Sequence, residues 1–344
     1  MLVARHVVRP RRGPDDAMLQ IHGIGHFHPE NEIDNAFLEA LDIGTNHTWI
    51  LERVGIQRRR TVLSLDYIRD TRNQDLRAAQ EAALHSNAET GRLASELAIE
   101  RAGLRPSDIG MVISGGCSPD TCIPAESARI ARALGIEAPA FDLHAACSTF
   151  GAQLHFVEKM GPALPDFVLL VQPENTTRVV DYSDRSTAVL FGDATSAAVV
   201  SSRVPGRARV TRTIFGSSPT GCDEVRIPRL GYFTQNGSAV QKFAIKKMSA
   251  LLEEIQEGLG PEAARRLIYV GHQANLTMLE SVCRRREIGA ERHWSNIVDF
   301  GNQCAAGAPS VLSQRWDELR GGDVVGMVVV GSGLSWSSMV IEVG

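Results

Sequence analysis

The chain has 344 residues, of which 43% are hydrophobic and 22% charged, and its formal net charge at pH 7 is -4. This composition predicts a soluble globular protein with one large core or two fused ones. It argues against a general nucleic-acid binder, because there is no domain-wide basic excess to neutralise phosphates. No apolar run approaches the length of a membrane span, so we expect no membrane partner either.

The cysteines and the first residues bear on the cellular setting. None of the 6 cysteines forms a Cys-x-x-Cys pair or a Cys/His grouping with zinc spacing, so we expect no structural metal. We interpret them as reduced thiols of a cytoplasmic protein. Residues 1–17 carry several arginines followed by Gly-Pro-Asp-Asp, which predicts a mobile polar tail, and Met18 could be the natural start. A transit peptide is the weaker alternative, because Asp15 and Asp16 interrupt it.

The first half of the chain alternates expected strands and helices. Residues 67–87 are polar and rich in Arg and Asp, and we expect them to form an excursion that covers a site. The expected strands span 19–27, 109–115, 138–143, 167–171, 187–191 and 197–201, and the expected helices span 34–41 and 88–102, with two more beginning at 125 and 148.

The second half repeats this pattern. A local match supports a duplicated unit, because Phe-Asp-Leu-His-Ala-Ala-Cys147 aligns with Val-Asp-Phe-Gly-Asn-Gln-Cys304. We therefore divide the chain into residues 18–206 and 207–344, and expect Cys147 and Asn302 at the starts of two related central helices that point into one site. The expected strands span 209–214, 266–270, 296–299, 324–330 and 338–343, and the expected helices span 240–258, 276–286 and a segment from about 305.

Cys147 is the leading candidate for a nucleophile. It falls between an expected buried strand and an expected helix, where free N–H groups and the positive end of the helix dipole lower a thiol's pKa and can hold an oxyanion. The small Ala145 and Ala146 leave room for a substrate. The alternative, a cysteine packed as a small hydrophobe at a helix start, carries about equal weight on this stretch alone.

Other side chains stand where a site could use them. His272 directly follows an expected buried strand, where α/β folds expose functional groups, and Asn302 takes the matching place two elements later. A lone His there is more often structural, but a Cys, a His and an Asn at corresponding strand ends are much harder to obtain by chance. Trp49 and Arg53 lie one helical turn apart and suit a nucleotide-like group. A half-buried Trp beside a solvated Arg is the alternative.

These motifs together resemble the β-ketoacyl-acyl-carrier-protein synthase III branch of the thiolase superfamily, from about Met18 onward. The resemblance implies an α/β protein with a five-layered αβαβα fold, a homodimer and a Cys-His-Asn triad. It rests on Thr-Asn-His-Thr-Trp-Ile-Leu-Glu-Arg53, Ala-Ala-Cys147, Asp184-Arg-Ser-Thr-Ala-Val-Leu-Phe-Gly-Asp193, His-Gln-Ala-Asn275, Gly-Asn302 and Gly331-Ser-Gly-Leu-Ser-Trp336.

The resemblance also implies a reaction. Cys147 would accept an acyl group from a thioester, with the N–H groups of Cys147 and Gly333 as the oxyanion hole. A malonyl-like second acyl group would lose CO2, and neutral His272 and Asn302 would donate hydrogen bonds to the enolate before it attacks the acyl-cysteine. The implied substrates are acyl-CoA or a phosphopantetheinyl acyl carrier protein, and no metal or redox cofactor is implied.

The same resemblance gives roles to residues around this triad. Thr45, Trp49 and Arg53 look like the wall of the pantetheine and coenzyme A channel, and Arg178 looks like a further contact there. Asn275 looks like a supporting residue of the site.

Departures from the family pattern indicate a specialised member. Ile123 looks like the residue that reaches across the dimer to close the acyl pocket of the other subunit, where housekeeping enzymes often carry Phe. Thr277 stands where a basic residue commonly docks the carrier protein. Arg284, Arg285 and Arg286, further along the same expected helix, could take over that docking, or could form a solvated basic face.

We therefore expect a Claisen-type condensing enzyme that joins carrier-bound acyl chains in polyketide or related natural-product biosynthesis. The alternatives are the starter condensation of fatty-acid synthesis, between acetyl-CoA and malonyl carrier protein, and acyl transfer to an oxygen or nitrogen nucleophile. A non-catalytic, carrier-binding partner in a heterodimer is a further alternative, against which the intact triad argues.

Overall fold

The computed structural model describes residues 18–344, so the tail expected at 1–17 lies outside the described residues. The strands are β1 (Leu19–Phe27), β2 (Asn31–Asp34), β3 (Arg58–Thr61), β4 (Met111–Ser114), β5 (Ala140–Asp142), β6 (Val168–Glu174), β7 (Ala194–Ser201), β8 (Ala208–Ser217), β9 (Val225–Arg226), β10 (Thr234–Gln235), β11 (Leu267–Gly271), β12 (His293–Trp294), β13 (Val324–Gly331) and β14 (Ser335–Val343). The helices are α1 (Asn35–Ala40), α2 (His47–Val54), α3 (Leu65–Thr71), α4 (Leu76–Ala82), α5 (Asn87–Arg101), α6 (Glu126–Leu134), α7 (Thr149–Met160), α8 (Arg185–Ala188), α9 (Gly237–Gly258), α10 (Pro261–Arg265), α11 (Leu276–Arg286), α12 (Ile297–Phe300) and α13 (Gly307–Gln314).

One large sheet has the strand order β12-β11-β13-β14-β8-β1-β7-β6-β4-β5. Outward from the centre, β1, β7 and β6 are antiparallel, and β4 and β5 then run parallel to β6. On the other side β8, β14 and β13 are antiparallel, and β11 and β12 then run parallel to β13. The division of the chain at residues 206/207 stays a prediction, and this matching order is what a duplication would produce.

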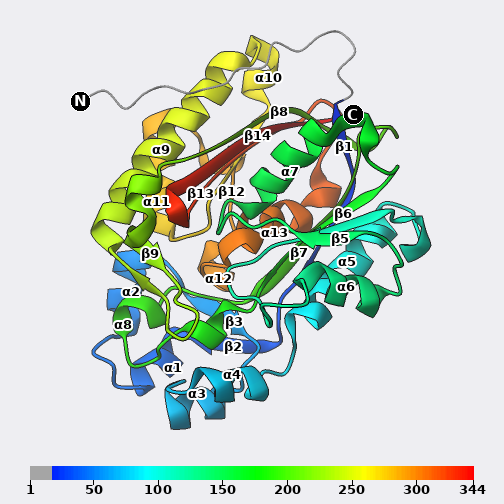
Figure 1. Ribbon diagram of the computed structural model, residues 1–344. Helices are drawn as coiled ribbons and strands as arrows, with labels where there is room; N and C mark the ends of the chain where they lie inside the picture. Colours follow the sequence, from blue (N-terminus) through cyan, green and yellow to red (C-terminus); the bar gives the residue numbers. More distant parts are fainter. Residues whose placement is uncertain (1–17) are drawn as a thin grey trace.

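Two central helices, α7 and α13, lie between the two halves of the sheet (Figure 1). Helix α7 packs on β8 and β14, while α13 packs on β1 and β7, so each covers strands of the opposite half. Their apolar residues, which recur at helical spacing, join one core with the strands: Phe150, Leu154 and Val157 on α7, and Val311 and Leu312 on α13.

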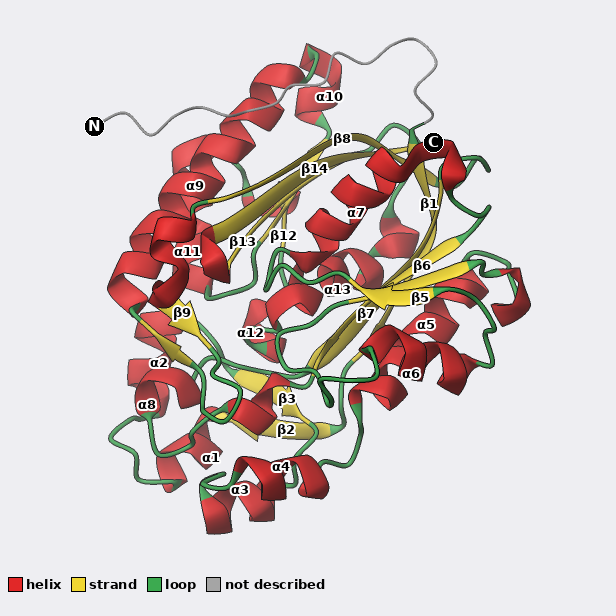
Figure 2. Ribbon diagram, viewed as in Figure 1, coloured by secondary structure: helices red, strands yellow, loops and turns green. Residues whose placement is uncertain are grey.

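The outer faces of the sheet are also covered by helices, as Figure 2 shows. Helices α5 and α6 pack with the β4, β6 and β7 side. Helices α9 and α11 pack with each other, and α9 packs on β13 and β14. The order helix, sheet, helix, sheet, helix confirms the expected thiolase-like α/β fold. Within residues 18–344, none of the helices combines the length and the apolar character needed to cross a membrane.

Local sequence explains where the principal helices begin. The Ser86 side chain accepts the N–H of Glu89, and the Glu89 side chain accepts the N–H of Ser86. This capping box starts α5. The side chain of Asn275 accepts the N–H of Met278 and starts α11 at the expected residue. The same helix ends where Glu287 takes a left-handed conformation.

Two of the expected strands are wrong. Residues 187–191 contain the end of α8, whose cap Asp184 accepts the N–H of Ser186, followed by a turn. Residues 296–299 fall mostly in α12, and the strand β12 lies just before them. Both segments are short apolar runs, for which periodicity does not distinguish a strand from a buried helical turn.

Two other expectations need correction. The strand expected at 138–143 is reduced to β5, which forms one edge of the sheet and is half-exposed or exposed rather than buried. Residues 67–87, expected as a polar excursion with no helix or strand assigned to it, contain much of α3 and all of α4. Ser64 and Asp75 cap the starts of these helices. Capping residues of this kind indicate a helix start, but here they stand among many other polar residues and were not recognised as caps.

Candidate active site

Cys147 lies in a tight turn between β5 and α7, which confirms the expected strand-to-helix junction. The preceding residue, Ala146, has a φ of 49°, in the left-handed region. The N–H groups of Ser148 and Thr149 donate to the carbonyls of Ala145 and Ala146 at 3.1 and 3.0 Å, and the Thr149 hydroxyl donates to Ala146 at 2.6 Å. The turn therefore holds the thiol at the start of a buried helix.

The end of β13 closes against this turn. A Cβ placed on Gly331 would lie 3.0 Å from the backbone nitrogens of both Cys147 and Ser148, so glycine is needed for the close approach. Gly333 follows with a φ of 114°, which also favours glycine. The loop that carries Gly333 thus begins in contact with the Cys147 turn.

His272 and Asn302 approach the same place from the second half of the chain. His272 follows β11 and is 5% exposed, and Asn302 lies between α12 and α13 and is 8% exposed. The N–H of Asn302 donates to Leu190 at 2.8 Å, and its Oδ1 accepts the N–H of Cys304 at 3.0 Å. Because Oδ1 is occupied, the Nδ2 amide group is the part of this side chain that is left to donate.

One cavity of about 350 Å³ joins Cys147, His272 and Asn302. Its walls are mostly apolar, and cavities of this size and character are typical of small-molecule sites. The apolar wall includes Val189, Leu190, Phe191, Phe233, Met278 and Val330.

The electrostatics favour a thiolate at Cys147 and a neutral ring at His272. Hydrogen bonds from the thiol of Cys117, and then from that of Cys304, lower the pKa of Cys147 to about 5, although burial acts in the opposite direction. Burial lowers the pKa of His272 to about 4, so its imidazole is uncharged at neutral pH. The sequence pointed to the helix start as the cause of thiol activation, whereas the neighbouring thiols supply much of it.

Trp49 and Arg53, both on α2, line the same cavity as the three candidate catalytic residues. The guanidinium of Arg53 lies 5.7 Å from the centroid of the Trp49 ring, and that of Arg185, on α8, lies 5.1 Å from it. Asn275 lines the cavity as well, while it caps α11. Arg185 belongs to a motif noted in the sequence, but its stacking on a distant Trp could not be predicted from spacing.

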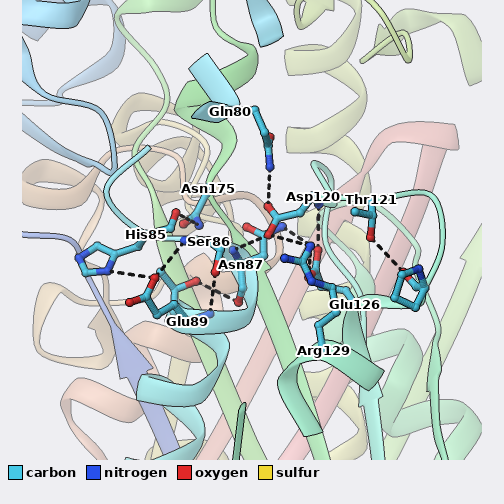
Figure 3. Close-up of polar contacts among 12 residues, drawn as sticks. Gln80, His85, Ser86, Asn87, Glu89, Asp120, Thr121, Glu126, Arg129 and Asn175 are labelled. Atoms are coloured by element: carbon cyan, nitrogen blue, oxygen red, sulfur yellow. Dashed lines mark hydrogen bonds and ion pairs between the residues drawn. The ribbon is translucent and has the colours of Figure 1, made fainter. Parts of the chain in front are cut away.

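Several predicted site residues lie away from this cavity. Arg178 is 3% exposed and forms an ion pair with Asp120 at 2.6 Å, so it is not among the described residues that line the cavity. Asp120 belongs to the polar network of Figure 3, where it also meets Arg129 at 3.3 Å. Thr45 is half-buried just before α2, outside the cavity lining of the described chain. Ile123 is 86% exposed on the loop between β4 and α6.

The basic run Arg284, Arg285 and Arg286 ends α11 on the surface. The first two are exposed. Arg286 forms an ion pair with Glu253 of α9 at 2.6 Å, so its charge is already paired within the chain. The outward charge of the run therefore comes mainly from its first two members.

Sequence reasoning missed two cysteines and a carboxylate beside the nucleophile. The Sγ atoms of Cys117, Cys147 and Cys304 all lie within 4.8 Å of one another. Glu174 is fully buried and accepts the N–H groups of Cys117 and Ala305 at 2.9 and 3.1 Å. The match between the segments that end in Cys147 and Cys304 was the one available signal, and nothing in the spacing indicated Cys117.

The fold and the site together define a class of protein. A thiolate at a helix start, beside neutral imidazole and amide donors in an apolar cavity, suits an enzyme that condenses acyl thioesters. Family models agree: that of 3-oxoacyl-[acyl-carrier-protein] synthase III matches residues 141–219, and that of its C-terminal part matches residues 257–343. The β-ketoacyl-[acyl-carrier-protein] synthase III of Syntrophomonas wolfei is 30% identical over 95% of this chain and 98% of that protein. The chain belongs to the 3-oxoacyl-[acyl-carrier-protein] synthase III family and is a Claisen-type condensing enzyme of the acyltransferase class.

Two solved structures extend this comparison. The 3-oxoacyl-[acyl-carrier-protein] synthase III of Aquifex aeolicus has a TM-score of 0.83 and 27% identity, and the match covers 94% of this chain and 99% of that one. The priming β-ketosynthase from the R1128 polyketide biosynthetic pathway has a TM-score of 0.80 and 27% identity, and the match covers 96% and 98% of the two chains. The relationship expected from the motifs is therefore confirmed.

Proposed function

We propose that Cys147 is the acyl acceptor of this condensing enzyme and that His272 and Asn302 stabilise the carbanion that attacks the acyl group. The observation that carries the proposal is the single cavity that all three side chains line. The bond from Cys304 to Asn302 Oδ1 supports it, because it turns the amide donor toward the cavity. The lowered pKa of His272 supports a neutral donor rather than a charged acid.

In the first step, the thiolate of Cys147 attacks the carbonyl of an acyl thioester and the substrate thiol leaves. The N–H groups of Cys147 and Gly333 hold the oxyanion, at the point where Gly331 brings the two loops together. In the second step, a malonyl-like thioester loses CO2, and the enolate oxygen accepts hydrogen bonds from His272 and Asn302. The carbanion attacks the acyl-cysteine, a C–C bond forms, and the thiolate is released.

For the substrate, the proposal is an acyl chain larger than acetyl, delivered by a carrier protein in natural-product assembly. The likeness to the R1128 priming β-ketosynthase and the apolar cavity of about 350 Å³ support it. Trp49, Arg53 and Arg185 form an aromatic and cationic surface at the cavity that suits a pantetheine or nucleotide group. Arg284 and Arg285 offer exposed positive charge for an acidic carrier.

The test is intact-protein mass spectrometry of the wild type and Cys147→Ala after exposure to a panel of acyl-CoA and acyl-carrier thioesters. We expect an acyl mass gain on the wild type alone, strongest with long or β-ketoacyl donors. Equal labelling of both proteins would overturn the role of Cys147. A strict preference for acetyl-CoA would replace the chain-joining proposal by the starter condensation of fatty-acid synthesis.

The enzyme is further proposed to be a homodimer that pairs through the β5 edge. β5 leaves one side of the sheet unpaired in the described chain, and Phe141 on it is 36% exposed. Asp142 accepts the N–H groups of Glu126 and Ser127 at 2.8 and 2.9 Å, so the loop with the exposed Ile123 lies beside this edge. An apolar side chain that is 86% exposed in one subunit is well placed to enter the other.

Sedimentation velocity tests the dimer. Phe141→Asp places a charge at the proposed interface, and we expect it to shift the protein from dimer to monomer. The control is Leu230→Asp, which makes the same kind of change at a side chain that is 94% exposed elsewhere. A monomeric wild type, or a dimer that tolerates Phe141→Asp, would contradict the proposed interface.

A further inference from the structure

Three cysteines that are far apart in the sequence meet beside the proposed acyl acceptor. Cys117 comes from the loop after β4, Cys147 from the turn before α7, and Cys304 from the short turn before α13. Their Sγ atoms lie within 4.8 Å of one another, and all three are free thiols. The condensation needs only one of these sulfurs, so the other two call for a separate explanation.

The cluster is held by a buried scaffold. The carboxylate of Glu174 accepts the N–H of Cys117 at 2.9 Å and that of Ala305, next to Cys304, at 3.1 Å, so one side chain fixes two of the cysteine-bearing loops. The hydroxyl of Thr176 lies 3.2 Å from Glu174 Oε2 and 3.6 Å from the sulfur of Cys304. These contacts hold the backbone of two cysteine-bearing loops beside Cys147.

The loop of Cys117 is anchored a second time at Asp120. The Asp120 carboxylate accepts the N–H of Asn87 at 3.0 Å and a bond from Gln80 at 3.1 Å, and its own N–H donates to Glu126 at 2.9 Å (Figure 3). The ion pair with the buried Arg178 completes the anchor. Because the backbone is fixed on both sides of it, Cys117 approaches Cys147 by side-chain rotation.

The three sulfurs differ in protonation. Hydrogen bonds from Cys117 and Cys304 lower the pKa of Cys147, whereas Cys117, which donates to Cys147 and Cys304, has a pKa well above its ordinary value. The bond from Cys117 lowers the pKa of Cys304, but donation to Cys147 and burial outweigh it. A thiolate that lines a cavity beside two protonated thiols is the usual arrangement of a peroxide-sensitive pair, in which one sulfur is oxidised and a neighbour resolves it.

We propose that Cys147 is a redox modification site, oxidised by hydrogen peroxide that enters the cavity and resolved by Cys117 as a reversible disulfide. In the first step, the thiolate of Cys147 attacks one peroxide oxygen, the O–O bond breaks, and protonation of the leaving hydroxide gives sulfenic acid and water. In the second step, the sulfur of Cys117 displaces the sulfenic oxygen, its proton leaves with that oxygen as water, and an S–S bond forms. The cysteines lose two electrons and the peroxide gains two.

Cys117 is a better resolving thiol than Cys304. Cys304 is 3% exposed and has a φ of 48°, and its own N–H is bound to Asn302 while Thr176 contacts its sulfur. Cys117 is half-buried, and its thiol bonds Glu174, Cys147 and Cys304. Cys117 is therefore the more exposed of the two thiols, and its reaction leaves in place the bond from Cys304 that positions Asn302.

The experiment exposes the intact wild-type protein, Cys117→Ser and Cys304→Ser to hydrogen peroxide and follows them by mass spectrometry and peptide mapping. In the wild type we expect the loss of two hydrogen atoms, a linked peptide pair containing Cys117 and Cys147, and complete reversal by dithiothreitol. In Cys117→Ser we expect a gain of two or three oxygens on Cys147 that dithiothreitol does not reverse. Cys222→Ser, a surface cysteine outside the cluster, is the matched control and should behave as the wild type.

A linkage between Cys147 and Cys304, or reversible oxidation retained in Cys117→Ser, would overturn the assignment of Cys117. Irreversible oxidation of the wild type would overturn the redox site altogether. Oxidation should also abolish condensing activity and dithiothreitol should restore it. That expectation rests on the proposed role of Cys147, whereas formation of the disulfide does not. Peptide linkage without any acyl labelling would therefore refute the proposed function and leave this inference standing.

Discussion

Removal of the Cys117 thiol should raise the pKa of Cys147. The nucleophile's pKa of about 5 is attributed first to the hydrogen bond from Cys117 and then to that from Cys304. Cys117→Ala deletes the first donor and leaves the second in place. The lost hydrogen bond stabilised the thiolate of Cys147 more than its thiol, so the ionisation equilibrium of Cys147 moves toward the protonated form.

The size of the effect follows from the strength of one hydrogen bond. Bonds to charged groups contribute about 1.5 to 3 kcal/mol, and a thiol is a weak donor, so we take ~1.5 kcal/mol, or about one pKa unit. At about pH 5.5 the thiolate fraction should fall from about three quarters to about one quarter, which slows a thiolate reaction about threefold. At about pH 8 both proteins are fully ionised, and the rates should be similar.

The assay is the rate of alkylation of Cys147 by iodoacetamide across this pH range, read from the Cys147 peptide by mass spectrometry. Cys222→Ala is the control, because it makes the same chemical change at an exposed residue outside the cluster. Circular dichroism of each variant establishes that the fold is retained. A pH profile for Cys117→Ala that coincides with the wild type would refute the reasoning that neighbouring thiols activate the nucleophile.

Three other outcomes are expected. Asn302→Ala should keep acyl-enzyme formation but lower condensation by about 10²- to 10³-fold, since its amide acts on the enolate; equal loss of both steps in a product assay would contradict this. Arg59→Met should lower the free energy of unfolding, measured in urea titrations, by about 2 to 4 kcal/mol. The reason is that the fully buried guanidinium donates to the carbonyl of Val189 and, at 2.6 Å, to Oδ1 of Asn35. An unchanged midpoint would show that these two acceptors find other partners. Burial lowers the pKa of His28 to about 3. An unfolded His titrates near ~6.5 and binds protons first, so His28 alone should contribute a loss of about 1 to 2 kcal/mol of stability from about pH 6.5 to about pH 5. The buried His26 and His272 add to the total fall, so the difference between the wild type and His28→Gln is the measured quantity.

Long periodic segments with caps could be predicted from the sequence, and short apolar segments could not. Residues 276–286 form α11 with the expected bounds, because a helical apolar pattern follows a capping Asn. Residues 187–191 and 296–299 contain equally apolar side chains but are too short to show a period, and their state is set by Asp184 and by packing against distant strands.

The candidate site shows the same division. Cys147 and His272 follow the strands β5 and β11, as chain order predicts, and they line one cavity with Asn302. Asn302 follows the short helix α12 rather than the expected strand, so its place in the cavity depends on packing that the sequence pattern does not show. The direction of the Arg178 side chain could not be predicted, because it is decided by an ion pair with Asp120, which is 58 residues away in the sequence. The meeting of Cys117 with the other two cysteines depends on a loop held by a buried carboxylate, and no spacing along the chain encodes that.

The exchange of the central helices between the two halves has a consequence for how the protein comes into being. Helix α7 packs on β8 and β14 of the second half as well as on β6 and β1 of the first half. During synthesis, the face of α7 that packs on β8 and β14 therefore stays uncovered until these strands of the second half have been made. Cys304, which bonds Cys147, also comes from the second half, so part of the environment that lowers the pKa of Cys147 is missing until that half has been made. The reactive cysteine is therefore a property of both halves together and not of the first half alone.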